Sequence, residues 1–347
     1  MKRIVFLTVF PCFLAVQAFA QADLQPAAIV NLTRSEPITV KQFRTEVERM
    51  ERTARRALSN SERREVLDAM INERLAIQAA EKDRLSVADS EVNRQIEQLR
   101  AQMVQAIGRQ PTEAEFATAV RNETGLDMAA FREQTRRQLL TQKYLMSKKQ
   151  STIESLKVPT EQEIINTYNL TKAQFVRPDT VRFSMIQVDY GSDAAAKTKA
   201  KELADRLFRE IGSSPSKFDE VVLRGQAPNS GYQAGDGGYL PRNMEAAQIV
   251  GQDFINTAFN LKQGEVSRLM EGARGYQIVK ITETYSQRNL ELDDIFQLGT
   301  RMTVRDYIGN AMLQERQMEV LSKATQELVA ELRAGKTFQV FDKNLVW

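Results

Sequence analysis

The sequence predicts an α+β fold in which a helical domain, built from both chain ends, carries an inserted α/β domain. Prolines are unevenly spaced: none lies between Pro37 and Pro111, and none follows Pro241, so long helices can fill both stretches. Between them, the apolar pattern changes at Val181 from helical spacing to the β-rich run 181–188. A chain of 347 residues has room for two domains at roughly 150 residues each.

Residues 1–20 have the form of a secretory signal peptide. Lys2-Arg3 precedes an apolar run over 4–16, and Ala18-Phe19-Ala20 has the spacing of a cleavage site. The run is shorter than the roughly 20 apolar residues of a membrane helix, and no later segment approaches that length. We therefore expect an exported protein with no membrane span and a mature chain that begins near Gln21.

Composition disfavours several classes of function. The chain has no histidine, which is the commonest metal ligand and the usual general base at neutral pH. Its one cysteine, Cys12, lies in the leader in a poor context for lipid attachment, so acylation is not expected. Metalloenzymes and serine-triad hydrolases are therefore disfavoured, and no metal or other cofactor is expected. The 48 basic residues nearly balance the 45 acidic ones, so no nucleic-acid partner is indicated, and no Walker-type nucleotide loop is present.

Residues 21–177 are predicted to be helical after a short strand at Ala28-Ile29-Val30. Helix starts are marked by capping boxes, in which serine or threonine is followed three residues later by glutamate or glutamine. Apolar residues at spacings of three and four then mark the helix faces. The capping residues are Thr39, Ser59, Thr112 and Thr160, and the clearest faces are Leu67, Met70, Ile71 and Leu75, then Val92, Ile96, Leu99 and Met103.

Residues 178–285 are predicted to form a compact α/β domain. The strand 181–188 lies between Pro178 and Gly191, where proline and glycine mark its ends. A helix, a glycine-rich segment, a short helix and a closing strand follow. These elements are expected at 193–211, 233–239, 254–261 and 275–281.

Residues 286–347 are predicted to contain one long helix followed by a strand. A helix of some 30 residues cannot bury its apolar stripe alone, because most helix stability in proteins comes from packing that face. We therefore expect this helix to pack on the amino-terminal helices, and Phe338–Phe341 to pair near Ala28–Val30. The stripe consists of Val304, Ile308, Met312, Leu321, Ala324, Leu328 and Leu332, with Gly335 as the stop.

Particular segments resemble a known family. Glu36-Pro-Ile-Thr39 before a helix and the run Leu67–Leu75 resemble the amino-terminal domain of SurA-type periplasmic chaperones and of related PrsA-like foldases. The central region resembles a parvulin (PpiC-type) peptidyl-prolyl isomerase domain through four segments in the family's order. These are Val181–Val188, the loop Gly235–Leu240, Phe254–Phe259 with Leu261–Ser267, and Gly275–Lys280.

The resemblance implies a prolyl site whose polar residues this chain lacks. Parvulins usually carry histidine at the positions of Met185 and Gln277, and a cysteine or aspartate near the position of Asn229. These three matched catalytic positions are expected to be inactive. The apolar residues of the parvulin site match this sequence better than the polar ones. The resemblance places Phe254 in the prolyl pocket, with Phe259 and Met244 as further substrate-binding walls, although core packing is an alternative for all three.

Isomerisation needs no covalent step, so an apolar pocket alone can lower part of the barrier of roughly 18–20 kcal/mol. A methionine at position 185 makes no strong hydrogen bond, however, so the polar support of the site is expected to be lost. We expect weak or absent turnover. The helical region carries five methionines, whose flexible thioethers suit surfaces that accept many partners. They are Met50, Met70, Met103, Met128 and Met146.

Three hypotheses follow. The first is a periplasmic chaperone that binds unfolded exported or outer-membrane proteins and retains a degenerate parvulin domain. The second is an active prolyl isomerase that works as a foldase, and the third is a secreted structural or adhesion module. The sequence leaves the client, the oligomeric state and any residual isomerase activity open.

Overall fold

A computed structural model describes residues 23–345, with the side chains of 105–107 left out. The predicted signal peptide and Cys12 lie outside the described residues. The chain divides into two compact units. Unit 1 comprises the residues up to Leu156 together with those from Arg316 onward, and unit 2 comprises Lys157–Glu315. The predicted α+β class, with a helical region before a mixed one, is confirmed.

Unit 1 is mainly helical, and no helix of the described residues is both long and apolar enough to cross a membrane. All four predicted capping boxes are formed, three of them in this unit at Thr39, Ser59 and Thr112. Its elements are β1 (Pro26–Val30), β2 (Glu36–Thr39), α2 (Val40–Ala54), α3 (Asn60–Lys82), α4 (Asp89–Ile107), α5 (Glu113–Thr124), α6 (Met128–Lys148), α7 (Gln150–Glu154), the second part of α13 (Val304–Ala334), β9 (Phe338–Val340) and the 3₁₀ turn η2 (Asp342–Asn344).

The two ends of the described chain meet in a three-stranded antiparallel sheet of order β2-β1-β9. Ala28 lies opposite Val340 and Val30 opposite Phe338, which is the pairing that the sequence predicts. The apolar side chains of this sheet pack on α2 and α3. The fully buried members of this core include Ile38, Phe43, Leu67, Ile71 and Leu75.

The second part of α13 packs on helices of the amino-terminal region. Leu328 is buried in a cluster with side chains of α3 and α6, and Leu332 packs against the same cluster. Arg333 fixes the contact with polar bonds, because its guanidinium lies 2.6 Å from the carboxylate of Asp68 and 3.1 Å from the side-chain oxygen of Asn72. The apolar stripe of this helix is thus covered around Leu328, whereas Leu321 of the same stripe is 43% exposed.

A buried glutamine holds the turn between β1 and β2. Gln78 on α3 is fully buried, and its side-chain oxygen accepts hydrogen bonds from the backbone N–H groups of Leu32 at 3.1 Å and Thr33 at 3.0 Å. The backbone N–H of Arg34 lies 3.4 Å from the same oxygen. The amide nitrogen of Gln78 donates to the carboxylate of Glu36 at 3.1 Å. One side chain therefore satisfies several groups that a tight turn leaves without backbone partners.

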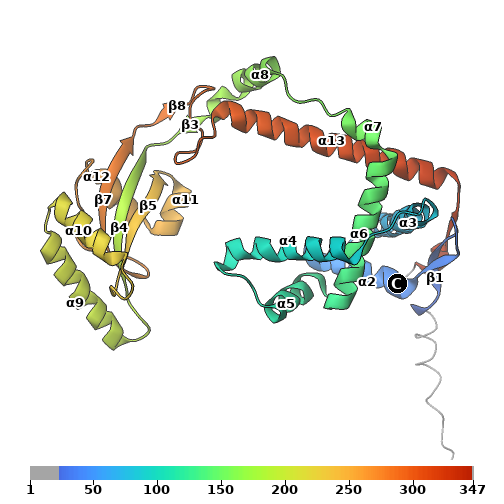
Figure 1. Cartoon of the computed structure of the whole chain (residues 1–347), viewed down its shortest axis with the longest axis horizontal. Coiled ribbons are helices and arrows are strands. Elements are labelled where there is room, and N and C mark those ends of the chain that lie inside the picture. Colours follow the sequence, from blue (N-terminus) through green and yellow to red (C-terminus); the bar gives the residue numbers. More distant parts are fainter. Residues whose placement is uncertain (1–22, 346–347) are drawn as a thin grey trace, which may run out of the picture. The chain divides into compact units, whose positions relative to one another are not determined.

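Unit 2 contains a four-stranded antiparallel sheet of order β5-β4-β7-β6. One face packs on α9 and α10 and the other on α11 and α12, so the sheet is covered on both sides (Figure 1). Its elements are α8 (Glu161–Thr171), the 3₁₀ turn η1 (Lys172–Gln174), β3 (Val176–Arg177), β4 (Thr180–Asp189), α9 (Ala194–Ile211), α10 (Pro215–Gly225), β5 (Gln233–Pro241), α11 (Met244–Val250), α12 (Gln252–Asn260), β6 (Met270–Glu271), β7 (Gly275–Tyr285), β8 (Arg288–Asn289) and the first part of α13.

Unit 2 is longer than the predicted α/β domain at both ends, because residues 157–177 and 286–315 pack within it. β3 pairs with β8, and the buried hydroxyl of Tyr168 on α8 donates to the carbonyl of Leu290 at 2.9 Å. Phe175 contacts the ring of Phe296 at a centroid distance of 6.0 Å. These contacts join segments that are distant in the sequence, so local patterns do not indicate them. Because α8 has the same periodicity as the helices before it, the sequence assigned it to the helical domain.

The glycine-rich segment forms strand β5, where a loop was expected. Gly237 shows why glycine is needed there, since a Cβ atom at this position would lie 2.2 Å from the ring of Phe183 on β4. The ladder between β4 and β5 is irregular between Phe183 and Ser184. The glycine thus lets a large aromatic ring lie against the neighbouring strand.

Candidate functional site

Strands β4 and β7 bring Met185 and Gln277 to the same face of the sheet. Gln187 lies directly opposite Gln277, and Met185 lies opposite Val279, so Met185 and Gln277 are diagonal neighbours. Both side chains are partly buried. Met185 packs against the apolar cluster under α11 and α12, which also contains Val279. The two matched positions therefore come together, but they form no hydrogen bond with each other.

Gln277 belongs to a polar row that sequence reasoning missed. Its amide nitrogen donates to the side-chain oxygen of Gln187 at 3.2 Å, and the amide nitrogen of Gln187 donates to the carboxylate of Asp189 at 2.6 Å. The amide of Gln233, on β5, lies 3.5 Å from the other oxygen of Asp189. Gln187 and Asp189 could have been found from the sequence, because side chains two residues apart on a strand share a face with Met185.

Phe254 is part of the core of unit 2. Its side chain is 5% exposed, and its ring contacts that of Phe183 edge to face at a centroid distance of 5.4 Å. Phe183 was not singled out from the sequence, although it lies two residues before Met185 on the same strand face. Phe254 is therefore nearly inaccessible from the surface.

The other two residues assigned to substrate binding lie differently. Phe259 is partly buried in the same cluster, with the guanidinium of Arg242 5.4 Å from its ring centre. Met244, the first residue of α11, is 79% exposed and is not part of that cluster. Val250, at the other end of α11, does pack there. The structure thus brings Met185, Phe254 and Phe259 into one apolar cluster and leaves Met244 on the surface.

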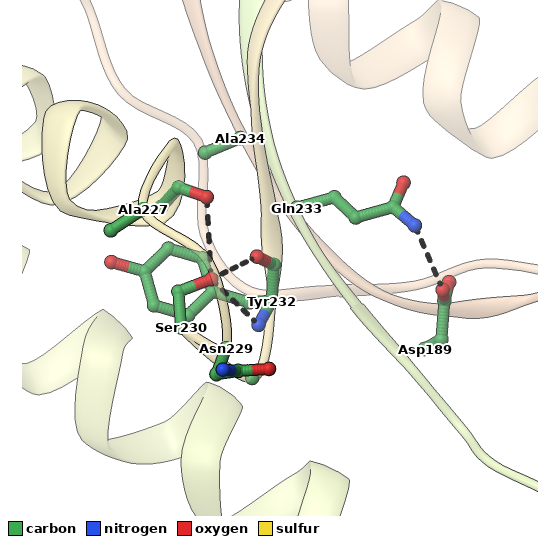
Figure 2. A pocket seen from close by; sticks show the side chains of 9 residues that line it. Asp189, Ala227, Asn229, Ser230, Tyr232, Gln233 and Ala234 are labelled. Carbon is green, nitrogen blue, oxygen red and sulfur yellow. Dashed lines mark hydrogen bonds between the residues drawn. The ribbon is translucent and has the colours of Figure 1, made fainter.

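Asn229 lies in the loop between α10 and β5, beside a pocket of about 470 Å³ (Figure 2). Its backbone is left-handed, with φ at 64°, so it occupies a tight turn that asparagine tolerates better than most residues. Asp189 and Gln233 also line this pocket. Asn229, the third position matched to the parvulin site, therefore lies beside the polar row and not in the apolar cluster around Phe254.

Arg182 ties three adjacent strands of the sheet, β5, β4 and β7, together. Its guanidinium lies 2.6 Å from the carboxylate of Asp236 on β5 and 2.8 Å from that of Glu283 on β7. The hydrogen bond from Arg182, helped by the backbone N–H of Gly238, holds the pKa of Asp236 below its usual value. The pKa of Glu283 is lowered by the hydroxyl of Tyr285 and by Arg182. The same bond to Glu283 raises the pKa of Tyr285 to about 12.

These pKa shifts predict an acid-sensitive unit 2. A carboxyl group whose pKa is lowered by folding stabilises the fold above its unfolded pKa of about 4, and this stabilisation disappears as the pH falls through the folded value. We expect the urea midpoint of unit 2 to fall between pH 5 and pH 2. Arg182→Met should lower the midpoint at pH 7 and flatten this pH dependence. Lys201→Met removes a cation whose partner Asp205 lies on the same helix, and should leave the pH dependence steep. Equal slopes in both variants would contradict the assignment to Arg182.

The fold defines a class of protein: a helical unit formed by both chain ends, combined with a parvulin-type sheet unit. Residues 1–145 match the family described as SurA-like N-terminal domain, and residues 159–296 match the PPIC-type PPIase domain. The chain therefore combines a SurA-like amino-terminal domain with a PPIC-type domain.

Curated relatives carry the names of chaperones and foldases. Chaperone SurA of Pseudoalteromonas translucida is 22% identical over 298 residues, which cover 84% of this chain and 65% of that protein. Chaperone SurA of Alcanivorax borkumensis is 28% identical over 64% of this chain and 47% of that protein. Foldase protein PrsA of Clostridium botulinum is 22% identical over 82% and 75%, respectively. The chain spans about half to two thirds of the length of these SurA relatives.

Solved structures of similar proteins are more distant. One is from the pair PEB4 and Cj1289, two SurA-like chaperones of Campylobacter jejuni, and is 14% identical over 91% of this chain and 100% of that chain, with a TM-score of 0.39. PrsA from Bacillus subtilis is 20% identical over 90% of this chain and 93% of that chain, with a TM-score of 0.27.

Proposed function

We propose that the chain is a periplasmic chaperone that binds unfolded exported or outer-membrane polypeptides, and that its parvulin-type unit has weak or no isomerase activity. The SurA-like match over 1–145 and the names of the relatives support the chaperone role. The leader-like residues 1–20 support export, and one of the two similar Campylobacter jejuni chaperones, Cj1289, is a periplasmic protein.

The observation that carries the isomerase part of the proposal is the filled apolar site. Phe183 lies against Phe254, which is almost fully buried, so the face that would receive a prolyl ring is already covered. Beside it, Met185 offers a thioether and Gln277 an amide already bonded to Gln187. Neither side chain titrates, and a thioether is only a weak acceptor. Such a site can offer little stabilisation that is specific to the twisted amide.

The helical unit offers surfaces that suit clients of varied sequence. None of the five methionines singled out above is buried, and Met50 and Met146 are 41% and 46% exposed. Met103 and Met128 pack at the edge of a small cluster between α4, α5 and α6, in which four of the described side chains are buried. Flexible side chains over a small core can adjust to different apolar segments.

The alternative is an active isomerase that works as a foldase. It is favoured by the PPIC-type match, which extends over 159–296 and so covers most of unit 2, and by the name of the PrsA relatives. In this case Phe254, which is 5% exposed, would have to become accessible when a client binds. The two functions differ in their products: a holdase keeps a client soluble, whereas an isomerase speeds the interconversion of prolyl bonds.

Two assays on the same sample test the proposal. The mature chain should suppress aggregation of a urea-unfolded porin at a near-stoichiometric ratio, and should speed a proline-limited refolding reaction little. Gln277→Ala serves as the internal control, because it should change both readouts by less than about twofold if the amide takes no part in turnover. Refolding rates comparable with those of an ordinary parvulin would favour the foldase, and failure to suppress aggregation would contradict the chaperone role.

A further inference from the structure

Unit 2 contains a pocket beyond the apolar cluster, at the end of β4 and beside the loop that joins α10 to β5. It has a volume of about 470 Å³. It is lined by Asp189, by Gln233 and by residues of the loop that include Asn229, Ser230 and Tyr232 (Figure 2). Neither the prolyl-site positions Met185 and Phe254 nor the methionine surface of unit 1 belongs to it.

Asp189 is the one charged residue among those that line the pocket. Its two carboxylate oxygens accept from the amides of Gln187, at 2.6 Å, and Gln233, at 3.5 Å. Within the described part of the chain, no lysine or arginine lies within salt-bridge distance of it, not even Arg274, which precedes the residue opposite Asp189. The carboxylate is thus held in place by neutral amide groups, with no cationic side chain of a described residue paired to it.

The rest of the pocket offers acceptors rather than cations. The hydroxyl of Ser230 lies 2.7 Å from the carbonyl of Tyr232 and 3.2 Å from that of Gly225, so its proton is directed at the loop itself (Figure 2). The side-chain amide of Asn229 forms no hydrogen bond with another described residue, so its oxygen can accept one. A carboxylate with nearby amide and carbonyl oxygens matches a group that only donates, as guanidinium and ammonium groups do.

We propose that this pocket binds the cationic side chain of an arginine or lysine in a bound polypeptide. The inference rests on the proposed function, because it names the chemistry of a client segment that reaches unit 2 while the helical unit holds the rest of the client. The polar row connects the pocket with the prolyl-site positions. Asp189 is hydrogen-bonded to Gln187, which is hydrogen-bonded to Gln277 beside Met185. At about 3.3 Å per residue, four positions of β4 separate Met185 from Asp189 by about 13 Å, so an extended client over Met185 can place a nearby basic residue in the pocket.

Three peptides of one design test the pocket with the full mature chain. The peptide acetyl-Ala-Xaa-Ala-Pro-Ala-Xaa-Ala-amide carries arginine, glutamine or glutamate at both Xaa positions, so it needs no assumption about chain direction. Binding is followed by the backbone amide resonances of Gly231 and Tyr232, which line the pocket. We expect the arginine peptide to bind about three- to fivefold more tightly than the glutamine peptide at low salt, and the glutamate peptide to bind least.

Two variants make the test specific. Asp189→Asn keeps the shape and removes the charge, so the arginine preference should disappear. Glu220→Gln removes an exposed carboxylate of α10 that does not line the pocket, and should leave the preference unchanged. Raising the salt concentration should weaken the preference in the wild-type chain, since the carboxylate is exposed.

Equal binding of the three peptides, or an arginine preference that persists in Asp189→Asn, would overturn the inference. Resonance shifts confined to residues outside the pocket would overturn it as well. The aggregation assay separates this result from the proposed function: a chain that suppresses porin aggregation without an arginine preference keeps the chaperone role and loses only the pocket. A chain that shows the arginine preference but does not suppress porin aggregation keeps the pocket and loses the chaperone role.

Discussion

Replacing Phe254 by alanine is expected to lower the free energy of unfolding of unit 2 by about 3 to 5 kcal/mol, the usual cost of truncating a buried phenylalanine. The side chain is 5% exposed, and the variant also loses its edge-to-face contact with Phe183. Hydrogen exchange of the β4 amides measures this loss within unit 2. Aggregation suppression should remain nearly intact, because the proposal assigns client holding to the helical unit.

Phe259→Ala is the matched control for this truncation. It removes the same atoms from the same helix at a partly buried position, so its effect on the β4 amides should be clearly smaller. If Phe254→Ala abolished client holding while the helical unit kept its stability, holding would depend on unit 2, and the proposed division of labour would be wrong.

Replacing Gln78 by methionine should lower the free energy of unfolding of unit 1 by about 2 to 3 kcal/mol. Methionine has nearly the same length, but it cannot replace an acceptor shared by the backbone N–H groups of Leu32 and Thr33. Each buried group that loses its partner costs about 1 to 3 kcal/mol, and the exposed part of this turn can regain some of that from water. Urea unfolding followed by helical circular dichroism measures the change.

Gln98→Met makes the same chemical change at an exposed position on α4. Surface substitutions of this kind usually stay within about 0.5 kcal/mol, so its unfolding curve should overlay that of the parent chain. If both variants changed the free energy of unfolding equally, the hydrogen bonds of Gln78 would make no contribution to the stability of unit 1.

Local signals in the sequence predicted much of the fold. The capping boxes at Thr39, Ser59, Thr112 and Thr160 all begin helices, because each needs only residues three positions apart. The apolar stripe of the last helix predicted the packing of its second part, around Leu328, on the amino-terminal helices. In its first part, Val304 and Ile308 are buried within unit 2 instead. The role of Gln78 could not be predicted, because its hydrogen-bond partners lie some 45 residues away along the chain.

The candidate site was predicted less well than the fold. Period-two alternation explains why Met185 shares a face with Gln277, but it does not say that Phe183 fills the space beside Phe254. That depends on Gly237 of the neighbouring strand, which leaves room for the ring. The exposed position of Met244 also depends on the start of a short helix, α11, which has no clear periodic signal in the sequence.

The location of a bound client tests the central claim most directly. Hydrogen exchange of the mature chain, with and without an unfolded porin held below its aggregation threshold, reports protection along the whole sequence. The account predicts that most of the protection falls in unit 1, on α4, α5 and α6, with a smaller change at the pocket around Asp189. Protection concentrated on β4, β7 and α12 of unit 2, with unit 1 unchanged, would contradict it.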